Sequence, residues 1–410
     1  MKLRGPILLV GTLDTKGEEI LYLRERLLAA GAEPLVIDVG VLDPAPFGPD
    51  VSREEIARRA GTSLAQLLAA RDRGRAVAAM ERGLAAWIRE RHAARPVAGV
   101  LAIGGSAGTT IATTAMRELP VGVPKLMVST LASGNTRPYV GTSDIAMMYS
   151  VADFTGLNRL TRTILGNAAN AMLGMCGLPV ETGGEDQRPL AAATMFGVTT
   201  PCVNQLKQLL EKEGFELLVF HATGTGGQAM EQLIRDGFIR GVLDITTTEL
   251  ADELAGGILS AGPHRLEAAG LAGVPQVVSV GALDMVNFGP LDSVPERFRS
   301  RKLYQHNPTV TLMRTTAEEN AQLGRIIAEK LNASRGPVAL FLPLKGVSAI
   351  DAPGQPFHDT EADQALFEAI RTSVGSNVKL VEVDAHINDP AFAARVAAEF
   401  LNITGGTHDA

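Results

Sequence analysis

The alternation of short apolar runs with amphipathic stretches is the feature that most constrains this chain. In the first part of the sequence, apolar runs lie at residues 7–10, 35–37, 97–103 and 125–129. Helical patterns lie between or after them, at residues 16–30, 76–91 and 109–119. Apolar strands that alternate with helices are typical of a parallel sheet covered on both faces. The pattern therefore predicts an α/β fold.

A polar, glycine-rich stretch interrupts this alternation at residues 177–189. The alternation then restarts, with apolar runs at 191–198, 217–220, 241–245, 276–280, 338–342 and 378–383. A chain of 410 residues has the length of two or three domains. We therefore predict an N-terminal domain over residues 1–182 and a C-terminal domain over residues 189–410, each with a mostly parallel sheet flanked by helices.

The second half of the chain resembles a repeat of the first. Asp38 and His221 each end an apolar run, seven positions beyond Gly31 and Gly214 respectively. This parallel favours a duplication of one α/β unit. The alternative is that all strand–helix–strand units share such spacing.

Composition excludes several classes of partner. The net charge is -7 and aromatic residues make up 4% of the chain, so we expect no binding to nucleic acid. No apolar run approaches the roughly 18 residues that span a bilayer, so we expect no membrane partner. The two cysteines form neither a zinc motif nor a disulfide framework. They suit a reducing compartment and predict a cytoplasmic protein.

The loop after the first predicted strand has the composition of an anion site. Thr12 and Thr15 can donate hydrogen bonds, Lys16 adds a positive charge, and the following helix begins with free N–H groups. The spacing is not that of a P-loop. The alternative is that Asp14 or Thr15 only caps the helix.

Two further strand ends carry glycines and hydroxyl residues. The first has Gly104, Gly105, Ser106, Gly108 and Thr109, and the second has Thr130, Ser133 and Gly134. Neither has the G-x-G-x-x-G spacing of a dinucleotide site. Ligands of parallel sheets bind beyond the carboxyl ends of the strands, so the three loops together predict a pocket for a phosphorylated ligand. Asp38 stands where a ribose hydroxyl would be bound, or else caps a turn.

The second half contains candidates for acid–base chemistry. His221, Glu249 and His306 follow or lie between predicted strands, as do Asp284 and Asp351. Such side chains serve as general acids and bases when they lie beside a substrate. The alternative is that they cap loops or form ion pairs.

Several of these motifs, at 11–16, 104–109, 129–134, 139–151, 221–227, 245–250 and 306–308, resemble those of one family. It is the bacterial, fungal and plant family typified by the ATP-binding N-terminal domain of the tomato mosaic virus resistance protein. The resemblance implies two Rossmann-like domains, ATP bound with Mg²⁺ by the N-terminal one, and a homodimer or higher homo-oligomer. Asp14 or Asp144 would place the Mg²⁺.

Two functions follow as hypotheses. The first is a nucleotide-binding protein that holds ATP on the three N-terminal loops. The second is an enzyme that acts on a small carboxylate or phosphorylated metabolite between the halves, with His221, Glu249 and His306 as catalytic residues.

Overall fold

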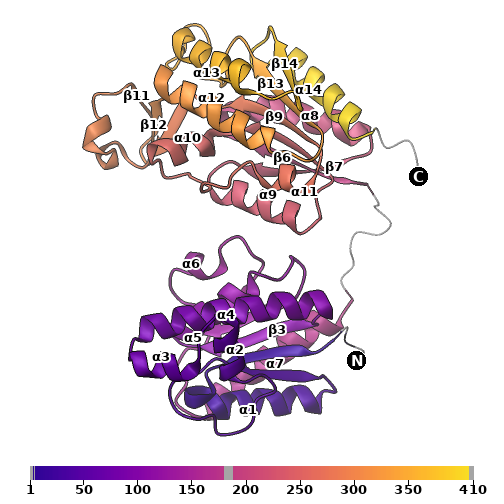
Figure 1. Cartoon of the computed structure of the whole chain (residues 1–410), viewed down its shortest axis with the longest axis vertical. Coiled ribbons are helices and arrows are strands. Elements are labelled where there is room, and N and C mark those ends of the chain that lie inside the picture. Colours follow the sequence, from indigo (N-terminus) through magenta and orange to yellow (C-terminus); the bar gives the residue numbers. More distant parts are fainter. Residues whose placement is uncertain (1–2, 4, 180–187, 406–410) are drawn as a thin grey trace. The chain divides into compact units, whose positions relative to one another are not determined.

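The computed structural model describes residues 3, 5–179 and 188–405, and the chain divides into two compact units, Met1–Gly184 and Glu185–Ala410 (Figure 1). The stretch expected to separate two domains lies largely outside the described residues. Within the described part, no helix is both long and apolar enough to cross a membrane.

Unit 1 contains one parallel sheet of five strands in the order β2-β1-β3-β4-β5. The strands are β1 (Ile7–Gly11), β2 (Pro34–Asp38), β3 (Gly99–Gly104), β4 (Lys125–Ser129) and β5 (Ala146–Tyr149). All residues of β1, β3 and β4 are buried, as the continuous apolar runs predicted. Strand β5 was not predicted, because it is a short edge strand that is only partly buried.

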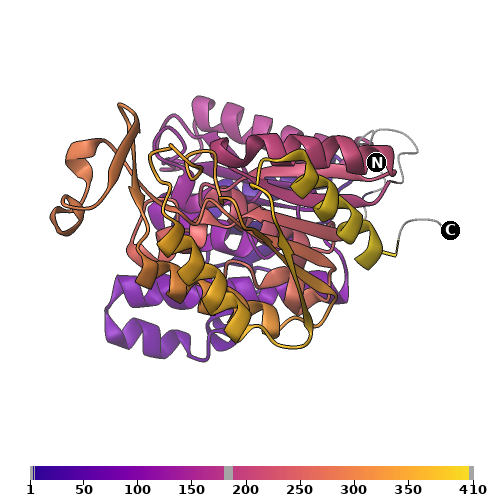
Figure 2. The same cartoon turned by 90° about the horizontal axis from the view of Figure 1, so that it is seen from above.

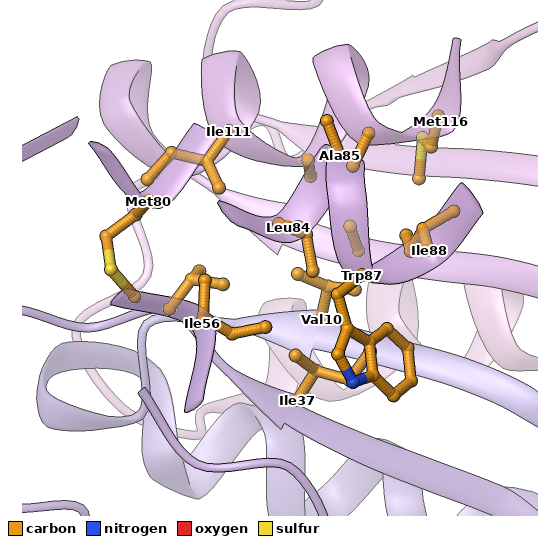
Figure 3. Close-up of a cluster of buried hydrophobic side chains, with 14 of the residues drawn as sticks. Val10, Ile37, Ile56, Met80, Leu84, Ala85, Trp87, Ile88, Ile111 and Met116 are labelled. Carbon is orange, nitrogen blue, oxygen red and sulfur yellow. The ribbon is translucent and has the colours of Figure 1, made fainter. Parts of the chain in front are cut away.

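Helices cover both faces of this sheet, with α4 and α5 on one side and α1 and α7 on the other (Figure 1). The helices are α1 (Leu13–Ala29), α2 (Arg53–Arg59), α3 (Leu64–Ala70), α4 (Arg73–Ala94), α5 (Ser106–Met116), α6 (Arg137–Val140) and α7 (Arg159–Gly177). Leu84 and Trp87 of α4 pack in one buried cluster with Val10 and Ile37 of the sheet (Figure 3). Full burial of such a side chain stabilises the fold by roughly 1.5–3 kcal/mol.

The strand order of unit 1 reverses between β1 and β3. The chain goes from β1 outward to β2, then returns to the other side of β1 and continues outward through β3, β4 and β5. Loops that follow β1 and β3 therefore diverge to opposite faces of the sheet. Such a switch point leaves a crevice at the carboxyl ends of the strands, where ligands of open α/β sheets bind.

Unit 2 has a six-stranded parallel sheet in the order β14-β13-β9-β8-β6-β7. Its strands are β6 (Leu190–Met195), β7 (Glu216–His221), β8 (Gly241–Thr246), β9 (Gln276–Gly281), β13 (Val338–Pro343) and β14 (Val378–Val383). The helices are α8 (Thr200–Lys212), α9 (Thr225–Arg235), α10 (Thr248–Ala255), α11 (Ala268–Ala272), α12 (Ala317–Asn332), α13 (Thr360–Ser373) and α14 (Pro390–Ile403). Helices α8 and α14 pack on one face of the sheet, and α9, α11, α12 and α13 on the other.

A second, antiparallel sheet in unit 2 was not predicted. Strands β10 (Met285–Phe288), β11 (Leu303–Asn307) and β12 (Val310–Arg314) pair in the order β10-β12-β11. Strand β11 and the connection that leads to it from β10 project from the body of this unit (Figure 2), whereas β10 itself is buried. The insertion lies between β9 and β13 and leaves the parallel order of the main sheet unchanged.

Both units begin with the same arrangement of strands. Counted from its first strand, each sheet has the order 2-1-3-4-5, which unit 2 extends by a sixth strand. Asp38 and His221 are the last residues of the second strand in each unit, and they pair with the last residues of the first strands, Gly11 and Met195. The positions matched in the sequence are therefore equivalent in the fold. The chain is an α/β protein of two Rossmann-like domains.

Candidate functional site

Unit 1 contains a pocket of about 800 Å³ at its switch point. The loops after β1, β2, β3 and β4 line one part of it, and the α3–α4 corner lines another. The lining residues are Thr12, Asp14, Thr15, Lys16, Val39, Val41, Leu42, Leu67, Leu68, Arg71, Asp72, Arg73, Ala76, Val77, Gly105, Ser106, Ala107, Gly108, Ile111, Thr130, Leu131 and Asp153. The volume is within the range of small-molecule sites.

The start of α5 supplies backbone donors to this pocket. The first N–H groups of a helix have no acceptor within the helix, and the N-cap residue Gly105 has no side chain that could accept from them. Ser106 adds an exposed hydroxyl. Gly104 lets the helix start this close to the strand, because a Cβ there would lie 2.8 Å from the Cα of Gly108. This end of the pocket is suited to an anion.

The start of α1 contributes the second set of polar groups. The hydroxyls of Thr12 and Thr15 are 2.8 Å apart. Lys16 has non-helical backbone angles (φ -130°, ψ 20°), which kink α1 after its first turn. Its ammonium group donates a hydrogen bond of 2.7 Å to the carbonyl of Phe154, so this cation also fastens the loop after β5.

Asp14 and Asp38 both lie near the start of α1, and of these two only Asp14 lines the pocket. Asp14 Oδ2 accepts a hydrogen bond from the N–H of Leu42, and its buried Oδ1 has no hydrogen-bond partner among the described residues. Asp38 is buried, and its Oδ1 accepts from the N–H groups of Leu13 and Gly40. Burial raises the pKa of Asp38 above its ordinary value. The side chain thus fastens two loops beneath the pocket and is not part of its lining, in agreement with the alternative that Asp38 caps a turn.

Much of the remaining wall of the pocket is apolar, and its charged residues are Arg71, Asp72, Arg73 and Asp153. Val39, Val41 and Leu42 come from the loop after β2, and Leu67, Leu68, Ala76 and Val77 come from α3 and α4. Ile111 of α5 completes the wall. A ligand that fits both ends would have one anionic part and one flat or apolar part.

Several predicted residues lie outside this lining. Thr109 is buried, and its hydroxyl is 2.7 Å from that of Ser129, which ties α5 to the end of β4. Ser133 and Gly134 are exposed in the loop after β4. These three residues, like Gly104, support the pocket or lie beyond it.

Asp144 lies at the opposite edge of the sheet. It precedes β5, and its carboxylate is 2.5 Å from the ammonium group of Lys125, the first residue of β4. It also accepts a hydrogen bond from the N–H of Gly122. The pocket is at the carboxyl ends of the same strands, so the prediction that Asp144 places a metal there is wrong. Its role is to pair with a fully buried lysine.

Glu249 of unit 2 is structural. The residue is fully buried, and its Oε1 accepts hydrogen bonds from the N–H groups of Gly224 and Gly227 at the start of α9. Its Oε2 is 2.6 Å from the guanidinium of Arg265, which also pairs with Asp244. Burial raises the pKa of Glu249. The helix start at residues 224–227 is thus occupied by a carboxylate of the chain itself, and Glu249 is not an available acid or base.

The two histidines proposed as catalytic lie on different sheets. His221 ends the edge strand β7, and its ring centroid is 5.3 Å from that of Phe196. His306 is exposed on strand β11 of the antiparallel sheet, not in a loop as expected. Within the described residues, no hydrogen bond or ion pair joins His221, Glu249 and His306. The structure therefore does not assemble them into one site.

No group of three His, Cys, Asp or Glu side chains in the described residues is arranged to hold a metal ion. A metal in the described part of unit 1 would therefore need ligands besides His, Cys, Asp and Glu side chains. Asp14, with its unpartnered Oδ1, and Asp153 are carboxylates in the pocket lining.

The α3–α4 corner was not predicted as part of the site. Leu67 and Leu68 lie within α3, Arg71 follows that helix and Arg73 begins α4, and their pattern is that of an ordinary amphipathic surface. The α3–α4 corner lies close to the loops after β1 and β3 only because of the path that the chain takes between β2 and β3. The clearest sign that this corner belongs to the site is the left-handed backbone conformation of Arg71, a residue other than glycine. This conformation is visible only in the structure.

The fold and the pocket define a class of protein with two Rossmann-like units and an open ligand pocket at the switch point of the first. The chain belongs to the family described as uncharacterised protein family UPF0261. Residues 5–180 match its N-terminal domain and residues 188–404 its C-terminal domain. The family membership expected from the loop motifs is confirmed.

Relatives span bacteria and a plant. The chain is 53% identical to a UPF0261 protein of Clostridium tetani, over 97% of this chain and 98% of the relative. It is 41% identical to the ToMV resistance protein Tm-1(GCR237) of Solanum lycopersicum, over 96% of this chain and 55% of the tomato protein. The ToMV susceptible protein tm-1(GCR26) is 46% identical over 81% of this chain and 45% of its own length. A solved UDP-N-acetylglucosamine 2-epimerase from Rickettsia bellii matches with 10% identity over 99% of this chain and 97% of its own, at a TM-score of 0.23, too low for a functional comparison.

Proposed function

We propose that the protein binds a nucleotide, ATP with Mg²⁺, in the pocket of unit 1. The observation that supports this most is the division of the pocket into a polar end and an apolar wall. The starts of α1 and α5 offer N–H groups and hydroxyls to phosphates, and the apolar wall accommodates a base. The position at the β1/β3 switch point is the one that open α/β sheets use for such ligands.

Asp14 is the residue that fits the magnesium ion. Its Oδ1 is buried without a hydrogen-bond partner among the described residues, while Oδ2 is fixed by the N–H of Leu42. Mg²⁺ is usually held by one or two carboxylates together with the phosphates of the substrate. When bound, the ion would neutralise part of the phosphate charge.

The proposal includes a cytoplasmic location and self-association. Both cysteines are free, as expected for a reducing compartment. Fluorescence microscopy of a tagged chain tests the location, and light scattering of the purified protein tests self-association. Fluorescence outside the cytoplasm would contradict the proposed location. A measured mass equal to that of a single chain would contradict self-association.

The first prediction uses Gly105 to test nucleotide binding. Its backbone (φ -83°, ψ -154°) is allowed to any residue, and an added Cβ would meet only the hydroxyl of Thr130, at 3.7 Å. Gly105→Ala should therefore fold normally, while its methyl group keeps a phosphate from the helix start. We expect saturable ATP binding with MgCl₂ by calorimetry, and an affinity at least about tenfold lower in the variant, a loss of about 1.4 kcal/mol.

Gly197→Ala in unit 2 is the matched control, because an added Cβ there meets nothing within 4 Å. Lys16→Ala is a less specific test, since it also removes the hydrogen bond to Phe154. Absence of heat and of any thermal shift at millimolar ATP would refute nucleotide binding. Equal affinities of wild type and Gly105→Ala would refute this position for the phosphates.

A further inference from the structure

The α3–α4 corner brings two arginines to the pocket. Arg71 follows the last residue of α3, and Arg73 is the first residue of α4. Both are exposed, and both belong to the pocket lining. With Lys16 they are the cationic side chains of that lining.

Neither arginine has a partner within the described part of the chain. No hydrogen bond, ion pair or cation–π contact involves either guanidinium. Asp72, which stands between them, caps α4 instead, because its Oδ1 accepts a hydrogen bond of 3.0 Å from the N–H of Arg75. Lys16 differs, since its ammonium group is bonded to Phe154. The two arginines are thus the pocket's uncommitted cations among the described residues.

The backbone at Arg71 is unusual for an arginine. The residue has φ 48° and ψ 29°, the left-handed conformation in which helices ordinarily use glycine. A residue with a side chain is strained there, and such strain is often found at ligand sites. Glycine would relieve the strain but would remove a guanidinium from the pocket.

We infer that Arg71 and Arg73 bind the distal phosphates of the ligand, so that the pocket selects for a polyphosphate chain. This inference extends the proposed function. A guanidinium binds phosphate oxygens with paired, charge-assisted hydrogen bonds, and an exposed arginine can adjust to them. A monophosphate or a nucleoside would lack the groups that these arginines bind.

The test compares four probes: inorganic tripolyphosphate, ATP, AMP and adenosine. Arg71→Gly removes the side chain in the conformation that glycine prefers, so the variant should be at least as stable as wild type. Arg73→Ala removes the second guanidinium. We expect each variant to bind tripolyphosphate and ATP about tenfold more weakly, with little change for AMP and none for adenosine. Arg75→Ala, an exposed α4 arginine outside the lining, should bind all four as wild type does.

The outcomes separate this inference from the proposed function. Suppose that the wild type binds tripolyphosphate but no nucleotide, and that the two arginine variants bind tripolyphosphate more weakly. The assignment of Arg71 and Arg73 to phosphate binding then stands, and the nucleotide proposal fails. Unchanged binding of ATP and tripolyphosphate by both variants would overturn the assignment. It would also be overturned if all three nucleoside probes weakened equally, since the guanidinium would then contact the base, or if the wild type bound no tripolyphosphate and no ATP.

Discussion

Glu249 illustrates how a residue's surroundings decide its role. Its carboxylate satisfies the N–H groups of Gly224 and Gly227, which a bound anion satisfies in many α/β proteins. A Cβ on Gly227 would lie 2.2 Å from Oε2, so the glycine makes room for this internal carboxylate and not for a ligand. The glycines at positions 224, 226 and 227 are visible in the sequence, but the sequence could not show that the carboxylate of Glu249 occupies this helix start.

The second prediction concerns Glu249→Gln. The change leaves Arg265, which is fully buried, with less compensating charge, and places an amide donor against a guanidinium. Breaking a buried ion pair costs about 3–5 kcal/mol, and we expect a loss near the lower limit because Asp244 still pairs with Arg265. Urea unfolding measures the change.

The matched control is Glu211→Gln, which removes an exposed pair with Lys207 and should change the free energy of unfolding by less than about 0.5 kcal/mol. ATP affinity should be unchanged in both variants. Wild-type stability combined with a loss of some enzymatic turnover in Glu249→Gln would restore the catalytic interpretation of this residue.

At the scale of elements, the strands and their ends were the predictable part. Continuous apolar runs identified β1, β3, β4 and β8, because strands buried on both faces admit few polar residues. The loops after β1 and β3 were correctly placed together, since parallel strands end at one edge. The α3–α4 wall and the antiparallel sheet were not predicted, because tertiary contacts position the first and strand β11 is largely exposed.

The third prediction contrasts two adjacent glycines at the end of β3. A Cβ on Gly104 would be 2.8 Å from Gly108 Cα, a backbone atom that cannot move aside without shifting α5. Gly104→Ala should therefore lower the free energy of unfolding by about 1–3 kcal/mol, as overpacking usually does. Gly105→Ala should leave it within about 0.5 kcal/mol of wild type. Denaturant unfolding measures the free energy of unfolding of both variants. Equal values for Gly104→Ala and Gly105→Ala would show that the close approach of Gly104 to Gly108 does not fix the start of α5.

At the scale of the whole molecule, unit 2 depends on a buried acidic cluster that joins its two sheets. Arg314, at the end of β12, is 2.7 Å from Asp363 Oδ1 and 3.5 Å from Asp351 Oδ1. Asp284 accepts a hydrogen bond from the hydroxyl of Ser348. Burial, with a contribution from the neighbouring Asp351, raises the pKa of Asp284 to about 7 and that of Asp363 to about 8. Two carboxyl groups thus pair with one guanidinium, whose charge also acts on Asp284, and Asp284 and Asp363 favour the protonated form.

The fourth prediction follows from these pKa values. The folded state binds these protons more tightly than the unfolded chain does. The contribution of the two carboxyl groups to the free energy of unfolding is therefore greatest below about pH 4, and it falls as the pH rises to about 8. Between pH 5 and 8 the unfolding free energy of unit 2 should therefore decrease. Asp284→Asn, which stays neutral, should make that decrease shallower.

Asp384→Asn, at an exposed carboxylate paired with Lys345, is the control and should leave the pH dependence as in wild type. Urea unfolding at several pH values measures both variants. A stability of Asp284→Asn that falls with pH as steeply as that of wild type would contradict the assignment of the proton to this cluster.

The position of the two cysteines has a practical consequence for all these measurements. Cys176 lies in unit 1 and Cys202 in unit 2, and burial raises the pKa of their thiols to about 11 and about 12. Cys202 is buried and Cys176 is half-buried, and a shielded, protonated thiol reacts slowly until its surroundings open. The chain thus carries one natural chemical reporter in each half, and a pulse of alkylating reagent, read by peptide mass spectrometry, distinguishes the unfolding of one half from that of the other without any engineered label.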